Sequence, residues 1–186
     1  MPLGAARFGL MAGDVKGSLI LLETQTASSD LLDFEALQES TYNVHFFTFT
    51  DINVTTQTEF GYRLSDDGGT TYETGYQFAN QRGYASGTFA ERKSTSQNTA
   101  RLGGDITTDS NSVFNGYMYL YNAGDSAKDT FSTSQCTFMQ GTTYTMEFGS
   151  QVYATASTIN GIRFGEGTSM GAFTSGTISC YGVKEE

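Results

Sequence analysis

Hydrophobic and polar residues alternate along most of this 186-residue chain, in short runs separated by clusters of Gly, Asn, Asp and Ser. Alternation with a period of two predicts β-strands, and the clusters predict the turns between them. The predicted strands are 19–24, 32–36, 42–51, 59–65, 74–80, 84–89, 99–103, 113–122, 131–138, 143–154, 159–164 and 176–183. Their number and spacing predict an all-β fold, an antiparallel β-sandwich.

One segment has an ambiguous pattern. Residues 29–37 combine a capping residue with apolar positions at helical spacing. We expect a strand that ends in a helical turn around residues 36–39.

Two predicted strands differ in how their faces are composed. Residues 42–50 carry apolar side chains on both faces, with His45 among them. This pattern predicts a strand covered on both sides, by a neighbouring chain, by the N-terminal arm or by its position in the middle of the domain. In 144–149, Tyr144, Met146 and Phe148 share one face and polar groups the other, which is typical of a sandwich strand with one solvated face.

A row of tyrosines is expected on the strand 113–122. Tyr117, Tyr119 and Tyr121 share one face, opposite Met118 and Leu120. Aligned phenols suit a subunit contact or stacking on sugar rings, since tyrosine brings a large area with a polar tip. The alternative is an aromatic ladder that only stabilises the sheet. The chain has no Trp, the usual residue of flat sugar platforms.

Composition limits the size and the partners of the protein. A chain of this length suits one sizeable domain, and 14 Phe, 11 Tyr, 22 Gly and only 16% charged residues favour half-buried strands. The net charge of -10 repels phosphates and anionic membranes, so we expect neither nucleic-acid binding nor membrane binding. No apolar run reaches the ~20 residues that span a bilayer.

Residues 1–18 are expected to form an extended N-terminal arm, and residues 19–186 the sandwich domain. Gly and Ala are too frequent in the arm for it to hold a core, yet Phe8, Leu10 and Met11, beside Arg7, are too apolar for a free tail. The arm is therefore expected to dock on another protein. It lacks the continuous apolar region of a secretory signal, so we expect synthesis in the cytoplasm, with Cys136 and Cys180 unpaired and partly buried.

Four blocks of the sequence resemble small jelly-roll-like virion proteins of tailed phages, notably those of cyanobacteria and other marine bacteria. They are the hairpin "RLSDDGGTTYETGYQF" (63–78), the strand "FNGYMYLYN" (114–122), the strand "NGIRF" (160–164) and the final strand "GTISCYGVK" (176–184). The blocks lie within residues 19–184, and residues 1–18 have no counterpart. The resemblance implies a jelly-roll-like structural subunit of the virion, a tail-fibre, tail-associated or capsid-decorating protein.

Enzyme signals are weak in this sequence. Residues 167–171 match the nucleophile motif G-x-S-x-G, but the only histidine, His45, lies far upstream, and a strand rather than a helix is expected to follow. His45 on its own is interpreted as a packed residue. Paired carboxylates for glycoside hydrolysis meet in space rather than in sequence, and no pair is marked out.

Metal signals are equally weak. One His and two distant Cys do not form a zinc ligand set. The residues Asp66-Asp67-Gly68-Gly69 lack the ligand pattern of a calcium loop and are interpreted as a turn. We therefore expect no cofactor, no metal and no catalytic residue.

The sequence thus favours a non-enzymatic bacteriophage virion protein, serving particle assembly or host attachment. We expect a homo-oligomer, a trimer by analogy with phage fibres and decoration proteins, that contacts other virion proteins. The surplus of aromatic positions supports this expectation. The alternatives are a carbohydrate-binding module for host surface glycans and a polysaccharide depolymerase.

Overall fold

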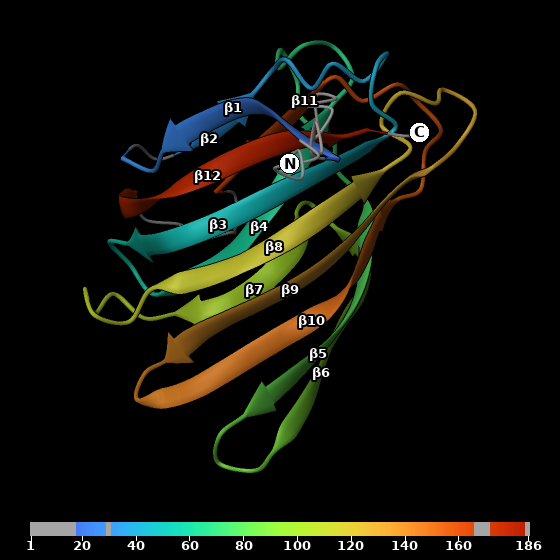
Figure 1. Cartoon of the computed structure of the whole chain (residues 1–186). Helices are drawn as coiled ribbons and strands as arrows, with labels where there is room; N and C mark the ends of the chain where they lie inside the picture. The colour runs from blue at the N-terminus through green and yellow to red at the C-terminus, as the bar shows by residue number, and fades with distance from the viewer. Residues whose placement is uncertain (1–17, 29–30, 166–171, 185–186) are drawn as a thin grey trace, which may run out of the picture.

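The computed structural model describes residues 18–28, 31–165 and 172–184, which fold as two antiparallel β-sheets packed face to face (Figure 1). The strands are β1 (Leu19–Thr26), β2 (Leu32–Phe34), β3 (Val44–Val54), β4 (Thr58–Ser65), β5 (Tyr76–Tyr84), β6 (Phe89–Gln97), β7 (Ala100–Ile106), β8 (Phe114–Tyr121), β9 (Thr130–Gln140), β10 (Thr143–Tyr153), β11 (Gly161–Phe164) and β12 (Phe173–Val183). The predicted all-β sandwich is confirmed.

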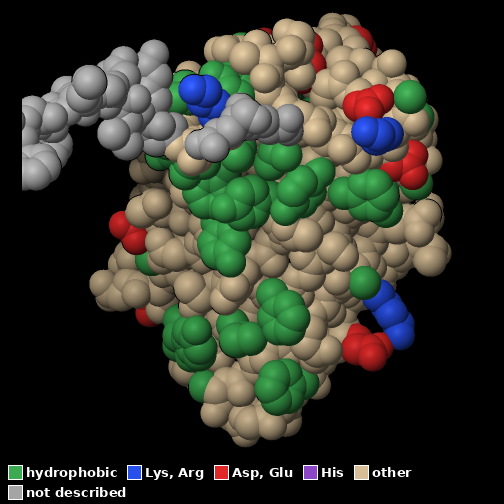
Figure 2. All heavy atoms as spheres, turned by 45° about the vertical axis from the view of Figure 1, so that its right-hand side comes forward, with side chains coloured by type: hydrophobic (Ala, Val, Ile, Leu, Met, Phe, Trp, Pro, Cys, Tyr) green, Lys and Arg blue, Asp and Glu red, His purple; other side chains and the backbone are tan. Residues whose placement is uncertain are grey.

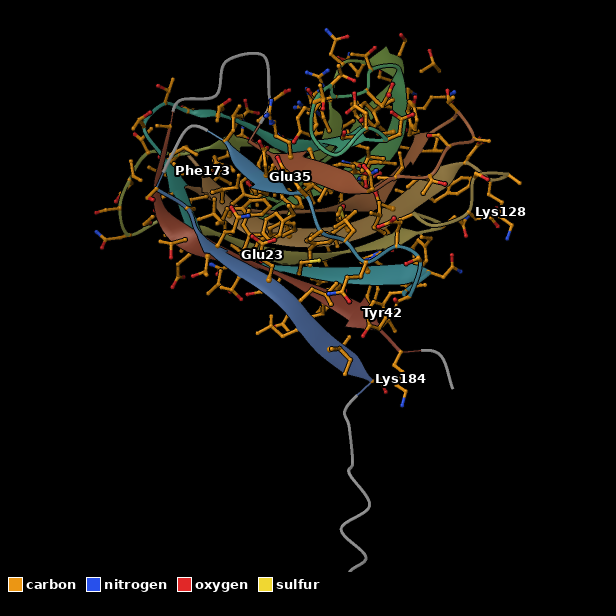
Figure 3. The ribbon with its side chains drawn as sticks, turned by 90° about the horizontal axis from the view of Figure 1, so that it is seen from above. Glu23, Glu35, Tyr42, Lys128, Phe173 and Lys184 are labelled. Atoms are coloured by element: carbon orange, nitrogen blue, oxygen red, sulfur yellow. The ribbon has the colours of Figure 1, made fainter. Side chains whose placement is uncertain are left out.

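The two sheets differ in size. The large sheet has eight strands in the order β1-β12-β3-β8-β9-β10-β5-β6, and the small sheet has four in the order β2-β11-β4-β7. Viewed from above, they form two layers with side chains filling the space between them (Figure 3).

Eight of the strands follow jelly-roll connectivity. Along the chain, β1, β2, β3 and β4 alternate between the two sheets, and β7, β8, β11 and β12 do so again, with β4 and β7 both in the small sheet. Their pairings are nested, because β1 pairs with β12, β2 with β11, β3 with β8 and β4 with β7. A long hairpin rolled into two layers has this pattern, so the jelly-roll-like prediction is confirmed.

The other four strands are two inserted hairpins. The hairpin β5–β6 is inserted between β4 and β7, and the hairpin β9–β10 between β8 and β11. Both join the same side of the large sheet, where β5 and β6 continue it beyond β7, the last strand of the small sheet (Figure 1). We call β9, β10, β5 and β6 the extension.

Interlocked phenylalanines fill the core between the jelly-roll strands. Phe49 of β3 meets Phe60 of β4 edge to face at 5.2 Å, and Phe47 meets Phe164 of β11 at the same centroid distance. All four rings are buried, and each contributes about 1.5–3 kcal/mol through burial. The inner face of β3 is therefore the centre of the core, which explains one of its two apolar faces.

Two local predictions were wrong. No helical turn occurs around residues 36–39, because Gln38 adopts a positive φ of 52° and its carbonyl accepts the N–H groups of Thr41 and Tyr42 in a turn. The strand predicted at 84–89 is instead the turn between β5 and β6, where Gly87 has a φ of 91°.

The strand β6 itself was not predicted. Its sequence is polar on both faces because it is an edge strand with β5 as its one neighbour. Hydrophobic alternation, the signal used to find strands, is absent from such a position. Within the described residues, no helix is long and apolar enough to cross a membrane.

Candidate functional site

The extension has the reverse polarity of an ordinary sandwich strand. In β10, Tyr144 and Phe148 are exposed on the outer face of the large sheet, while Thr145, Glu147 and Gln151 are buried on the inner face. The predicted alternation of this strand is confirmed, but its polar face is the buried one. A structural role alone would favour apolar residues inside.

A charged pair fills the inner face of the extension. The guanidinium of Arg82 on β5 donates from Nε to Oε2 of Glu147 at 2.8 Å, and its Nη1 donates to Asp105 Oδ2 at 3.0 Å. Side-chain exposure is 1% for Arg82 and 0% for Glu147. Burial by itself lowers the pKa of Arg82, but the adjacent Glu147 carboxylate and the hydrogen bonds to Arg82 raise it above its usual value, so Arg82 remains protonated.

Amide and hydroxyl groups connect this pair to the rest of the core. Asn80 Nδ2 donates to Glu147 Oε1 at 2.9 Å, and Gln151 Nε2 donates to Asn80 Oδ1 at 3.1 Å. Ser132 donates to the other end of the Gln151 amide and meets Tyr62 Oη at 2.7 Å. Hydrogen bonds therefore compensate the buried polar groups, as stability requires.

The interior is polar here because the small sheet has only four strands and ends at β7, so it does not cover the whole inner face of the extension. At the edge of the sandwich, Glu59 of β4 reaches Arg92 of β6 at 2.6 Å and also pairs with Arg101. Ion pairs suit this border because their outer members are partly solvated. Since arginines hold all three carboxylates of this network, Glu59, Asp105 and Glu147, the cluster is structural and does not present the free acid and base of a glycosidase.

Aromatic side chains project from the outer face of the extension. Phe131, Phe148, Tyr144 and Phe89 have exposures of 46%, 44%, 49% and 71%. Hydrophobic side chains form one large group and smaller separate groups on uncharged surface, with charged side chains toward the margin (Figure 2). We call the outer face of the large sheet over β8, β9, β10, β5 and β6 the extension face.

Three adjoining hollows cross the extension face. The first trough, of about 600 Å³, lies between Tyr117 of β8 and Phe148 of β10, with Thr133 and Gln135 of β9 between these strands. The larger second trough, of about 650 Å³, lies beside Phe131. Its other outward residues are Gln77, Ala79, Lys93, Thr95, Ser150 and Val152.

A connecting hollow of about 340 Å³ joins the two troughs. It shares Phe148 and Gly149 with the first trough, and Ala79 and Lys93 with the second. The three hollows therefore form one path across β8, β9, β10, β5 and β6. This path is concave and is flanked by aromatic side chains.

Charge is nearly absent from the extension face. Among the charged residues of the four extension strands, Arg82, Arg92 and Glu147 serve the inner network. The outward pair, Glu91 and Lys93, is joined by a 2.6 Å ion pair. The net charge of -10 therefore resides elsewhere on the protein.

The three predicted contact tyrosines lie next to the first trough, on the outer face of β8. Tyr117 contacts Tyr119 edge to face at 6.2 Å, and Tyr119 stacks on Tyr121 at 6.2 Å. Phe46 of β3 lies 4.7 Å from Tyr119, which accounts for the outer apolar face of β3. The phenols are fixed, since Tyr117 donates to Gln135 Oε1 at 3.0 Å and Tyr121 is 3.1 Å from Thr133 Oγ1.

The remaining sequence candidates do not join this face. His45 is buried, and its Nε2 donates to the Leu37 carbonyl at 2.6 Å. Cys136 and Cys180 are buried and free, and burial raises the pKa of the Cys180 thiol to about 12. The G-x-S-x-G match at 167–171 and the docking-arm residues Arg7, Phe8, Leu10 and Met11 lie outside the described residues.

The interpretation of residues 66–69 as a turn is confirmed. Gly68 and Gly69 have φ values of 71° and 84°, and Asp67 Oδ1 accepts the Thr71 N–H at 2.8 Å. Backbone and side-chain hydrogen bonds from Thr71 lower the pKa of Asp67. No cluster of three or more metal-ligating side chains occurs in the part of the chain that the structure describes.

Comparison with known proteins gives no match, whether the chain is compared with protein-family models, with curated proteins or with solved structures.

Sequence reasoning missed Phe131, Phe148 and Gln135 as candidates. Alternation identified the outward row of β8 and of β10, but the troughs exist only because β9 lies between these strands. The sequence did contain one signal of the exposed aromatic face. In β10 the face opposite Tyr144 and Phe148 is polar, and this polar face is the one that packs inside, so the aromatic side chains lie on the outer surface.

Proposed function

We propose that the protein is a non-enzymatic virion protein of a bacteriophage, a jelly-roll subunit that attaches the particle to its host through the extension face. The observation that carries the proposal is the reversed polarity of the extension, which buries Arg82 and Glu147 and exposes Phe131 and Phe148.

Reversed polarity is costly for a sheet that serves stability alone. A partly exposed phenylalanine forgoes part of the roughly 1.5–3 kcal/mol that its burial would provide. Exposed aromatic groups on a concave, uncharged surface are typical of binding surfaces, where such side chains contribute most of the affinity. The extension is therefore best explained as a binding element added to a jelly roll that folds through its phenylalanine core.

The particle context rests on the sequence resemblance. The blocks that resemble phage virion proteins lie in the jelly roll and its turns, including the Asp67 turn, β11 and β12, and the first block also includes the start of β5. We expect copies of this jelly-roll subunit to form a closed cyclic assembly that contacts other virion proteins. The extension face would then remain exposed to the host cell.

Two measurements test this proposal. Mass spectrometry of purified particles is expected to detect the protein as a component of the virion. Particles that carry Phe131→Ser and Phe148→Ser together are expected to contain normal amounts of the protein and to adsorb more slowly to host cells. Thr41→Ala is the control, since Thr41 is exposed in the loop before β3 and lines none of the three hollows. Absence from particles would overturn the virion assignment, and unchanged adsorption would overturn the attachment role.

A further inference from the structure

We infer that the extension face binds a neutral glycan, which lies along the first trough, the connecting hollow and the second trough. This inference rests on the proposed attachment function and names its ligand. Four properties of this path support it: the aromatic side chains that flank it, the polar groups between them, the small number of charges, and its length.

The walls of the troughs suit sugar rings. Tyr117 and Phe148 flank the first trough, and Phe131 flanks the second. An aromatic ring has a negative face, which attracts the weakly positive C–H groups on the apolar face of a pyranose. Tyrosine and phenylalanine provide such faces, although the chain has no tryptophan.

The polar groups between the walls suit hydroxyl groups. Tyr117 donates to Oε1 of Gln135, which leaves the Nε2 amide of Gln135 without a hydrogen-bond partner among the described residues. Ser150 and Gln77, in the second trough, likewise have no side-chain hydrogen bond to another described residue. Amides and hydroxyls both donate and accept, as sugar hydroxyls do, and a few such groups in a mostly apolar site fix the orientation of a ligand.

The charges favour a neutral ligand over an ionic one. Two cations line the path, and each is paired with a carboxylate, Lys93 with Glu91 and Arg92 with Glu59, both at 2.6 Å. An anionic polysaccharide or a nucleic acid would meet a protein of charge -10 without a free cation on this face.

The length of the path favours an oligosaccharide over a single sugar. In the pairing of β9 with β10, Phe148 lies opposite Gln135 and Phe131 lies opposite Val152, so four residues separate the two phenylalanines along the strands. At about 3.4 Å per residue, their separation along the strand direction is about 14 Å. The path therefore fits an extended oligosaccharide that contacts both rings.

The test uses the full chain and a glycan array that contains neutral and anionic polysaccharides, followed by calorimetry with maltohexaose, cellohexaose and mannohexaose, and with hexagalacturonate as the anionic probe. At least one neutral glycan is expected to bind. Phe148→Ala and Phe131→Ala are each expected to weaken that binding about tenfold, because aromatic anchors dominate such sites. Gln135→Leu, which keeps the size but removes the amide, is expected to weaken it less.

Thr41→Ala, which changes an exposed residue outside the three hollows, is the control and is expected to bind as the unmodified protein does. All variants change exposed residues, so thermal unfolding should be unaltered and folding failure would not explain the losses. Absence of binding to every neutral glycan, stronger binding to hexagalacturonate, or equal binding by Phe148→Ala would overturn the inference. Self-association that Phe148→Ala abolishes would identify a second copy as the occupant and would also overturn it.

The result separates this inference from the proposed function. A protein that binds neutral glycans but is absent from particles would retain the inference and remove the virion role. A virion protein whose adsorption depends on Phe148 but which binds no neutral glycan would retain attachment and remove the glycan.

Discussion

At the scale of single residues, the buried pair Arg82 and Glu147 makes the largest individual demand on stability. Arg82→Met removes the guanidinium that donates to Glu147 and leaves a fully buried carboxylate held mainly by Asn80. Removing one partner of a buried pair typically costs about 3–5 kcal/mol. We expect a loss of that size in the free energy of unfolding, measured by urea denaturation.

The double variant Arg82→Met with Glu147→Leu distinguishes an unpaired charge from lost packing. It is expected to recover much of the stability, since apolar replacement of both partners is often close to neutral. A single Arg82→Met variant as stable as the unmodified protein would contradict the role given to this pair.

His45 predicts a pH dependence of stability. Burial lowers its pKa from the usual value of 6.5. Its Nε2–H donates to the Leu37 carbonyl, and Nδ1 has no partner among the described residues, so a second proton would be placed on an unsatisfied buried atom. Below pH 6.5 the unfolded chain binds this proton and the folded chain resists it, so stability falls as the pH falls below 6.5 and levels off below the lowered pKa.

The measurement is the free energy of unfolding between pH 7.5 and 5, compared with that of His45→Gln. One proton can contribute at most about 1.4 kcal/mol per pH unit. The unmodified protein is expected to lose more stability over this range than His45→Gln does, and parallel curves for the two proteins would show that His45 does not carry the effect.

At the scale of elements, the join between β10 and β5 depends on a glycine. A Cβ added to Gly149 would lie less than 3.0 Å from Asn80 Oδ1 and from the Ala79 carbonyl oxygen. Gly149→Ala is therefore expected to disturb both the strand pairing and the Asn80 hydrogen bonds, with a loss of about 1–3 kcal/mol. Ser150→Ala, on the next and exposed position, is the control, and equal melting temperatures for the two variants would contradict this reasoning.

Sequence alternation predicted the elements of the jelly roll better than those of the extension. The strands β3, β4, β8 and β12 have one face in a dry core, so their hydrophobic period was clear and their ranges were close. The edge strand β6 has no such face and was missed. The helical turn at 36–39 was wrong because apolar residues there, such as Leu37, enter the core from an irregular segment.

The candidate site was only partly predictable for a related reason. The tyrosine row of β8 follows from period two within one strand. The troughs require β9 beside β8 and β10 beside β5, and these pairings are set by long-range packing. The reversed polarity of β10 could not be predicted from its own sequence either. Glu147 can be buried only because Arg82 and Asn80 bind its carboxylate, and these residues lie more than sixty positions away in the sequence.

At the scale of the whole molecule, we expect self-association outside the extension face. Leu19 and Leu21 on the edge strand β1 are 43% and 56% exposed, far from the troughs. Exposed apolar groups at an unpaired strand edge favour a further contact between copies. Light scattering is expected to give three times the 20.1 kDa chain mass, unchanged by Phe148→Ala. A monomer mass at micromolar concentration would contradict the trimer.

The distribution of charge over the molecule leads to a final prediction. Among the described acidic residues, Glu91 is the one that lines the three hollows, and it forms an ion pair with Lys93. Salt weakens interactions between charges, and a neutral ligand makes no such interaction with the protein, so its affinity should depend little on salt. The affinity of an anionic ligand would instead fall steeply as the Debye length decreases. We expect the affinity for the best neutral glycan to change less than about twofold between 0.05 and 0.5 M NaCl. The measurement is calorimetric titration at several salt concentrations, with Lys93→Gln as the comparison. A steep loss of affinity with salt, removed by Lys93→Gln, would mean that Lys93 acts as a free cation and that the ligand is anionic.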